Sequence, residues 1–195
     1  MTFTIAITNH DAVKQICGTY IFDGSKVLDC TFGKGMFWKF EHNLELVTLD
    51  RFLPAQIQGD FRFLPFKDQI FDAAFFDPPY YVGAQTISKS RMMKTSSNFE
   101  PQKSQDNVRN LYMKGMMECS RSVKNKGIIV VKCSDGCPYY PMMSWIVDLK
   151  IGKYKDVVIR TNMAIRNFRT PGKIHKMKTS HSYFIVLQNS YQGSE

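Results

Sequence analysis

The segment with the most specific chemistry in this sequence is Asp77-Pro78-Pro79-Tyr80. Its two prolines fix the backbone and remove two amide donors, so the Asp77 carboxylate and nearby carbonyls can accept hydrogen bonds from an amine. Tyr80 adds a flat face on which a base can stack. A proline turn with a packed tyrosine is the purely structural alternative. We interpret Asp77, Pro78, Pro79 and Tyr80 as a candidate catalytic set for an amine on a flat ring.

Two further aspartates occupy positions like that of Asp77. Asp29, Asp50 and Asp77 each come at the end of a short apolar run that is typical of a buried strand. Ligands of an open parallel sheet bind beyond the carboxyl ends of its strands, so we expect the three to converge on one crevice. Asp50 lies 21 positions after Asp29, a spacing at which the second acid accepts hydrogen bonds from ribose hydroxyls.

A glycine turn, Phe32-Gly33-Lys34-Gly35, lies between the first two aspartates. The glycines would let the backbone approach a ligand closely, although a simple strand-to-helix turn would also use them. Trp38 stands where a dinucleotide fingerprint would place its third glycine. This disfavours a nicotinamide cofactor, and with it a dehydrogenase.

Apolar runs alternate with helical periodicities along the chain, which favours an α/β fold with a parallel sheet. Helices are predicted over residues 9–20, through Phe37, Trp38 and Phe40, and over residues 106–123. Strands are predicted over residues 26–29, 44–49, 71–76, 127–132, 157–160 and 182–187. Asn9 or Asp11 can cap the first helix. Residues 84–105 and 161–178 lack periodicity and are predicted to be long loops.

Length and composition bound the architecture. With 195 residues, of which 44% are hydrophobic, we expect a single domain over residues 1–195. No apolar run approaches the roughly 20 residues that cross a bilayer, and the first residues lack a signal pattern, so we expect a cytoplasmic protein without membrane contact. The five cysteines have no CxxC spacing, which predicts reduced thiols and no metal site.

Charge is distributed unevenly. Residues 1–83 hold seven Lys/Arg against ten Asp/Glu, whereas residues 84–195 have a net charge of +12. A basic face offers a surface for phosphates, so nucleic acid is the expected partner. A solvated basic loop is the alternative. The candidate phosphate contacts lie in a segment that interleaves basic and apolar residues, and they are Arg166, Arg169, Lys173, Lys176 and Lys178.

The order of these motifs resembles the class I S-adenosylmethionine-dependent methyltransferases that modify amino groups of nucleic acids, especially the N6-adenine and N4-cytosine DNA enzymes. The motifs are, in chain order, Asp29 to Gly35, Asp50, Gly59-Asp60 and Asp77 to Tyr80. The resemblance spans most of the chain. It implies a Rossmann-like sheet of seven strands, mostly parallel and flanked by helices, with the last strand antiparallel. It also implies S-adenosylmethionine as cofactor, with ribose at Asp50, adenine near Asp60 and Phe61, and the target amine at Asp77. The implied cofactor-binding residues are Asp29, Phe32, Gly33, Gly35, Asp50, Asp60 and Phe61.

The sequence departs from this family in two respects. Cys30 and Thr31 stand where the family often has Pro and Phe after the first aspartate, and the aromatic ring comes at Phe32. A sizeable target-recognition domain does not fit into 195 residues. We therefore expect sequence specificity to be low, or to lie in the two predicted loops or in a separate partner. The expected oligomeric state is a monomer or homodimer.

Methylation of adenine N6 in DNA is the leading interpretation, because an aspartate in the first tetrapeptide position resembles the adenine enzymes more than the cytosine enzymes. The alternatives are an RNA base methyltransferase acting on guanine N2 or adenine N6, and a DNA cytosine-N4 enzyme. A catalytically silent nucleic-acid-binding module is a more distant alternative. The tetrapeptide itself does not distinguish DNA from RNA.

Overall fold

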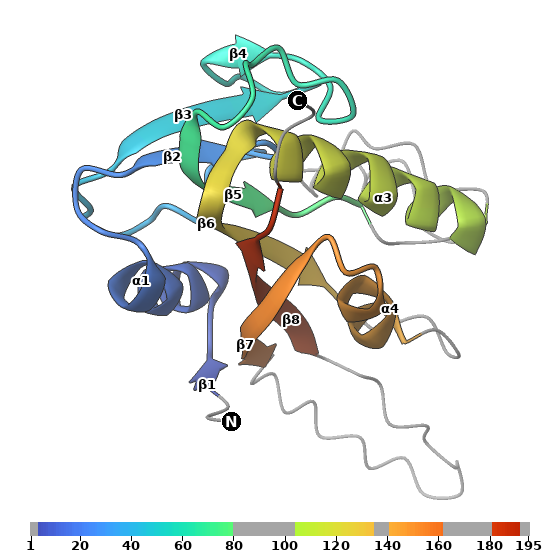
Figure 1. The fold of residues 1–195 in the computed structure, drawn as a ribbon. Coiled ribbons are helices and arrows are strands. Elements are labelled where there is room, and N and C mark those ends of the chain that lie inside the picture. Colours follow the sequence, from blue (N-terminus) through green and yellow to red (C-terminus); the bar gives the residue numbers. More distant parts are fainter. Residues whose placement is uncertain (1–3, 80–103, 135–140, 162–180, 192–195) are drawn as a thin grey trace, which may run out of the picture.

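A computed structural model describes residues 4–79, 104–134, 141–161 and 181–191 of the chain. Its centre is one eight-stranded sheet in the order β1-β7-β8-β6-β5-β2-β3-β4 (Figure 1). The strands are β1 (Thr4–Ala6), β2 (Lys26–Asp29), β3 (Glu45–Asp50), β4 (Ile57–Gln58), β5 (Phe71–Phe76), β6 (Val123–Cys133), β7 (Gly152–Thr161) and β8 (His181–Asn189). The helices of the described residues are α1 (Asn9–Tyr20), α3 (Gln105–Ser122) and α4 (Met142–Asp148).

All strands of the sheet are parallel to their neighbours except β8. It runs antiparallel to both β6 and β7, while the other adjacent pairs are parallel. The predicted α/β class, with a mostly parallel sheet and an antiparallel last strand, is confirmed. The sheet has eight strands rather than seven, and two of them, β1 beside β7 and β4 beside β3, lie outside the ranges predicted as strands. A strand of three residues is too short to give a periodic signal in the sequence.

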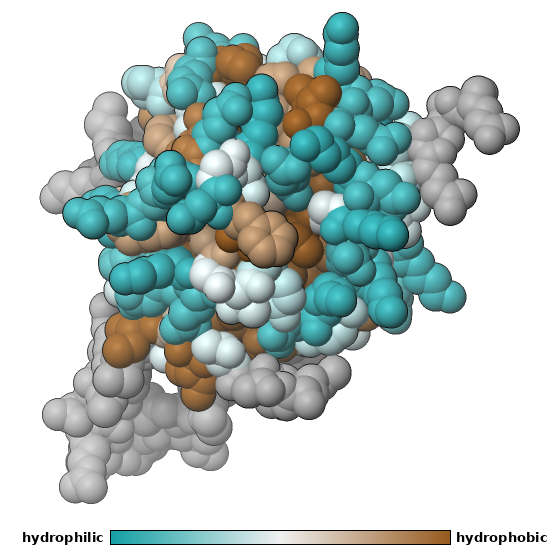
Figure 2. Space-filling model, turned by 60° about the vertical axis from the view of Figure 1, so that its left-hand side comes forward, coloured by the Kyte–Doolittle hydropathy of each residue, from teal (hydrophilic) through white to brown (hydrophobic). Residues whose placement is uncertain are grey.

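Helices cover both faces of the sheet. Helix α1 packs on one face, and α3 and α4 pack on the other (Figure 1). Successive strand residues point to opposite faces, so Phe75 joins the core under α1 and Phe76 joins the core under α3. The outer surface turned forward in Figure 2 is mostly hydrophilic, with apolar side chains in scattered small groups.

The first helix begins with a different cap from the one predicted. Thr8, rather than Asn9 or Asp11, is the N-cap residue, and its side chain accepts a hydrogen bond from the Asp11 backbone N–H. Asp11 in turn accepts from the Thr8 backbone N–H, which completes a capping box. Asp11 therefore acts from the third helical position, where it satisfies the amide of the cap residue.

The predicted helix through Phe37, Trp38 and Phe40 is wrong, because the chain between β2 and β3 forms turns. A helix would direct Phe37 and Trp38 about 100° apart. The turns instead bring both rings onto Phe75, with ring centroids at 6.4 Å and 5.0 Å. Gly33 and Gly35 make these turns with φ values of 59° and 66°, a left-handed conformation that favours glycine. Tertiary packing of the aromatic rings thus overrides local helix spacing.

Other predictions fall partly outside the described residues. Most of the predicted loops at 84–105 and 161–178 lie outside the described residues, but α3 already begins at Gln105 with Ser104 as its cap. The described cysteines are all buried and unbridged. No helix among the described residues is both long and apolar enough to cross a membrane.

Two helical glycines with opposite surroundings test how tightly α3 packs on the sheet. A Cβ atom at Gly115 would lie 2.2 Å from the Phe76 Cζ atom and 3.0 Å from the Phe61 Cδ2 atom, whereas nothing lies within 4 Å of one at Gly18. We expect Gly115→Ala to lower the free energy of unfolding by roughly 1–3 kcal/mol through overpacking. The matched Gly18→Ala should raise it by about 0.5–1 kcal/mol. Urea unfolding measures both, and a gain in stability for both variants would contradict the close contact of α3 with Phe76.

Candidate active site at the carboxyl edge of the sheet

Three aspartates lie together at the carboxyl ends of adjacent strands. Asp50 ends β3, Asp29 ends β2 and Asp77 follows β5, and these strands are neighbours in the order β3-β2-β5. Burial raises the pKa of the Asp29 carboxyl to about 7, and the nearby charges of Asp77 and Asp50 add to that shift. The edge of the sheet is therefore a region of concentrated negative charge.

Asp29 anchors the turn that follows its strand. Its carboxylate accepts a hydrogen bond from the Thr31 backbone N–H at 3.0 Å and another from Trp38 Nε1 at 2.7 Å. The residue is only 1% exposed. Because a fully buried carboxylate is costly unless donors surround it, the position of Trp38 is explained by what Asp29 requires.

Asp50 organises the backbone of two turns, one after β2 and one after β3. One carboxylate oxygen, Oδ2, accepts from the Gly33 N–H at 2.8 Å, and Oδ1 accepts from the N–H groups of Phe52 and Leu53, each at 2.8 Å. A carboxylate has about four lone-pair positions, so these contacts leave one direction on Oδ2 for a ligand hydroxyl. The Gly35 turn closes over Phe32, whose ring would lie 2.9 Å from a Cβ atom at Gly35.

Asp77 is held by two contacts from other strands and turns. Its backbone N–H donates to Thr31 Oγ1 at 2.7 Å, and its Oδ2 atom accepts from Lys132 Nζ at 2.7 Å. Oδ1 has no hydrogen-bond partner among the described residues. Pro78 is buried and Pro79 is half-buried, whereas Tyr80 lies outside the described residues. The carboxylate is thus fixed through one oxygen and presents the other.

Lys132 is a site residue that sequence reasoning did not select. It lies near the carboxyl end of β6, and its side chain is 9% exposed. The ammonium lies 5.6 Å from the Phe37 ring centroid and 5.8 Å from that of Phe184, and the Tyr112 hydroxyl donates to the Lys132 carbonyl at 2.9 Å. In the sequence, Lys132 is recognisable only as a lysine that directly follows an apolar strand run. Strands at the protein surface show the same pattern, so it does not mark a site residue.

The remaining predicted cofactor contacts have partners within the protein. Asp60 pairs with Arg62 and lies 3.4 Å from Arg51, and the hydrogen bonds from Arg62 hold the pKa of the Asp60 carboxyl below its usual value. Phe61 is buried and packs edge-on against Phe76 at 5.1 Å. The structure directs Phe61 into the core and Asp60 toward two arginines.

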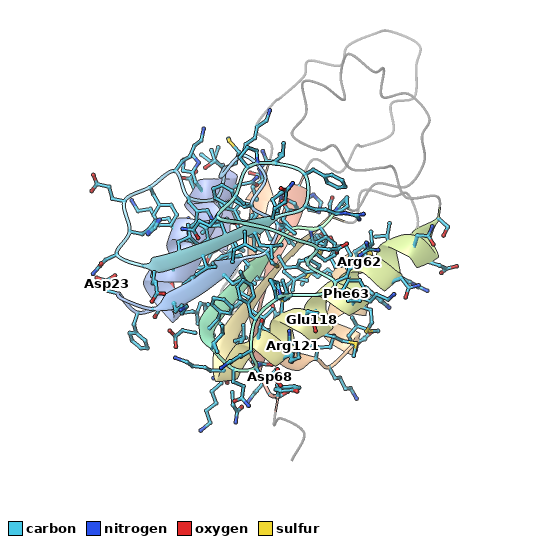
Figure 3. All side chains as sticks on the ribbon, turned by 90° about the horizontal axis from the view of Figure 1, so that it is seen from above. Asp23, Arg62, Phe63, Asp68, Glu118 and Arg121 are labelled. Carbon is cyan, nitrogen blue, oxygen red and sulfur yellow. The ribbon has the colours of Figure 1, made fainter. Side chains whose placement is uncertain are left out.

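The segment after Asp60 is fastened to α3. Glu118 accepts from the Leu64 backbone N–H, and Arg121 bridges Glu118 and Asp68. Figure 3 shows Asp68, Arg121 and Glu118 together along α3, with Phe63 and Arg62 farther along the same helix. These contacts fix the segment between β4 and β5 to the last turns of α3.

The predicted phosphate contacts at Arg166, Arg169, Lys173, Lys176 and Lys178 lie outside the described residues. Among the residues that the structure describes, no three His, Cys, Asp or Glu side chains are grouped as metal ligands would be.

No protein-family model and no curated protein matches this sequence, but solved structures share its fold. A chain of the complex between the Haloferax volcanii Trm112 methyltransferase activator and a methyltransferase is 12% identical, with a TM-score of 0.58 over 95% of this chain and 91% of that chain. A TehB-like SAM-dependent methyltransferase from Corynebacterium glutamicum is 13% identical, with a TM-score of 0.54 over 95% of this chain and 89% of that chain.

The N-methyltransferase NodS from Bradyrhizobium japonicum, solved with S-adenosyl-L-homocysteine, is 9% identical, with a TM-score of 0.54 over 92% of this chain and 85% of that chain. At such identities the similarity concerns the fold. The chain has the Rossmann-like fold of the SAM-dependent methyltransferases.

Two Asp–Lys ion pairs join β5 to β6, one at each end of the strands. Comparing them tests how much burial increases the contribution of an ion pair to stability. Asp77–Lys132 and Asp72–Lys124 both have N–O distances of 2.7 Å, but the Lys124 side chain is 51% exposed. We expect Lys132→Met to lower the free energy of unfolding by roughly 2–4 kcal/mol, because it strands a partly buried carboxylate. Lys124→Met should cost less than about 1 kcal/mol. Equal losses in chemical denaturation would show that the inner pair is solvated like the outer one.

Proposed function

We propose that this protein is an S-adenosylmethionine-dependent methyltransferase that methylates an exocyclic amine of a nucleobase, with adenine N6 in DNA as the leading target. The observation on which this proposal depends is the state of Asp77. It lies at the carboxyl end of β5, is followed by two prolines, and keeps Oδ1 available while Lys132 holds Oδ2. A carboxylate in that state is suited to accept a hydrogen bond from an amine.

The residues at the site fit the cofactor that the fold suggests. S-adenosylmethionine supplies a methyl group on a positively charged sulfur, and its net charge is positive. The free lone-pair direction of Asp50 suits a ribose hydroxyl, and the positive-φ backbone at Gly33 and Gly35 suits close approach of a ligand. The surplus of carboxylates around Asp29 favours a cation.

The protein's own residues would act on the amine in three ways. Asp77 Oδ1 and the Pro78 carbonyl would accept its two N–H hydrogens, which orients the nitrogen lone pair and increases its nucleophilicity. Lys132 would hold Oδ2 of Asp77 and so prevent the carboxylate from rotating. Oδ1 would also be the basic atom placed to take the proton that the amine releases. A base within a duplex would first have to be flipped out of the stack.

The test is methyl transfer to defined nucleic acids. The protein is incubated with methyl-labelled S-adenosylmethionine and with duplex DNA, single-stranded DNA or transfer RNA, and the methylated nucleoside is identified after digestion. We expect the product to be N6-methyl-2′-deoxyadenosine. A methylated guanine or a ribonucleoside would place the enzyme among the RNA alternatives, and absence of label together with absence of cofactor binding would overturn the proposal.

The role of Asp77 has its own matched variants. Asp77→Asn should lower the rate of transfer by about 10²–10³-fold, because its one amide oxygen would face Lys132 and a donor NH₂ would replace the oxygen that accepts from the amine. Cofactor affinity should stay near that of the wild type. Asp72→Asn alters the other aspartate of β5, which also pairs with a lysine at 2.7 Å but lies at the far end of the strand. It should leave transfer unchanged. Wild-type rates for Asp77→Asn would show that the amine is held elsewhere.

A further inference from the structure

Arg160 and Ser182 face each other near the carboxyl edge of the sheet. They are direct cross-strand partners in the β7–β8 ladder. Arg160 shares its face of β7 with Val158, and Ser182 shares its face of β8 with Phe184. Both therefore point to the α1 side of the sheet, which is also the side of Asp77 and Lys132.

Each of the two residues has a buried polar atom without a partner. Arg160 Nε and Ser182 Oγ are inaccessible to solvent and make no hydrogen bond, and Ser182 is only 4% exposed. Arg160 also forms no ion pair within the described part of the chain. Leaving such groups unsatisfied costs about 1–3 kcal/mol each, and more for a charged group. Because both atoms are covered in this structure, an anion would reach them when the half-buried Arg160 side chain turns outward, and it would then satisfy both donors.

The position of Arg160 and Ser182 within the sheet indicates which kind of anion would bind there. Side-chain alternation places six polar residues on the α1 face at the carboxyl edge, one on each of six neighbouring strands. The acidic members occupy β3, β2 and β5, where the cationic cofactor is proposed to bind, and the basic members lie beyond them. In spatial order the residues are Asp50, Asp29, Asp77, Lys132, Ser182 and Arg160.

We propose that Arg160 and Ser182 form a phosphate-binding site for the backbone of the nucleic acid that carries the target base. The inference rests on the proposed function and specifies how its substrate is held. Three strand spacings, about 14 Å, separate the Arg160 strand from the Asp77 strand. Arg160 is therefore too far away to touch the reacting amine but close enough to hold a phosphate of the same polymer. A guanidinium beside a hydroxyl matches the donors that phosphate oxygens accept.

The salt dependence of oligonucleotide binding tests this site. Each phosphate contact adds about 0.7 to the slope of log affinity against log salt for a single strand. We expect Arg160→Gln to reduce the slope by about that amount and to weaken binding about tenfold at low salt, with S-adenosylmethionine affinity unchanged. Lys153→Gln is the matched control, since it removes one exposed positive charge from the other end of β7. It should leave the slope near the wild-type value.

Ser182→Ala separates binding from folding. Because the hydroxyl is buried without a partner, its removal should leave the thermal midpoint unchanged or raised, while it weakens oligonucleotide binding severalfold. Inorganic phosphate and a mononucleotide are titrated in parallel, and each should raise the thermal midpoint of the wild type but not that of Arg160→Gln. If the free anions protect the wild type but the oligonucleotide does not bind, the site takes free phosphate and not a nucleic-acid backbone, which would contradict the proposal.

The outcomes distinguish the two proposals. If the wild type transfers methyl groups and binds the oligonucleotide, but Arg160→Gln keeps the full slope, the phosphate site is overturned and the proposed function stands. If the wild type neither transfers methyl groups nor binds S-adenosylmethionine while phosphate still protects it through Arg160, the proposed function fails and the anion site stands. If phosphate protects the wild type and Arg160→Gln equally, the site is overturned whatever the enzyme does.

Discussion

The ion pair between Asp77 and Lys132 balances a concentration of charge that the fold itself creates. Three neighbouring parallel strands end in aspartates, and the burial of Asp29 among them is sufficient to raise the pKa of its carboxyl to about 7. Removing charges from water is expensive, and a buried pair is stable only with good geometry and further hydrogen bonds. Here the N–O distance is 2.7 Å and Thr31 adds a hydrogen bond to the Asp77 backbone. The pair fixes the end of β5 against β6.

The same carboxylates shape the loops around them. Asp29 holds Thr31 and Trp38, and Asp50 holds Gly33 together with the backbone that follows β3. The turns between β2 and β3 are therefore ordered by strand-end acceptors, and no helix is needed to satisfy their amides. A site built in this way has its donors and acceptors in place before any ligand arrives, which is the arrangement that electrostatic catalysis favours.

The sequence was sufficient to predict features that depend on local pattern. Buried strands such as β5 show continuous apolar runs, and α3 has a clear helical face, so both were predicted within a residue or two. Strand β6 begins earlier than predicted, at Val123, which pairs with Phe71 in the ladder. The sequence did not show this part of the strand because Lys124 to Lys126 are exposed and polar. The helix predicted at Phe37 to Phe40 failed because contacts with Phe75 and Asp29, distant in sequence, determine that segment.

Within the site, the sequence identified acids but not their partners. Asp29, Asp50 and Asp77 were recognisable because each ends an apolar run. Lys132 lies 55 positions after Asp77, and a basic residue after a strand is usually a solvent contact, so only the sheet order shows that it is a partner. The gradient from acidic to basic residues along the carboxyl edge likewise depends on strand order, because the strands that form it are not consecutive in the chain.

The proposed function requires that the negative charge around Asp29 favours the positively charged methyl donor. The most direct measurement is the affinity for S-adenosylmethionine and for S-adenosylhomocysteine, determined by calorimetry between pH 6 and pH 8. Asp29 has a pKa raised to about 7, and a bound cation favours its ionised form, so affinity for a cation must increase as pH rises through that value. We expect S-adenosylmethionine to bind severalfold more tightly at pH 8 than at pH 6, and S-adenosylhomocysteine, which lacks the sulfonium charge, to change much less. Identical pH dependence for the two ligands would contradict recognition of the sulfonium by these carboxylates.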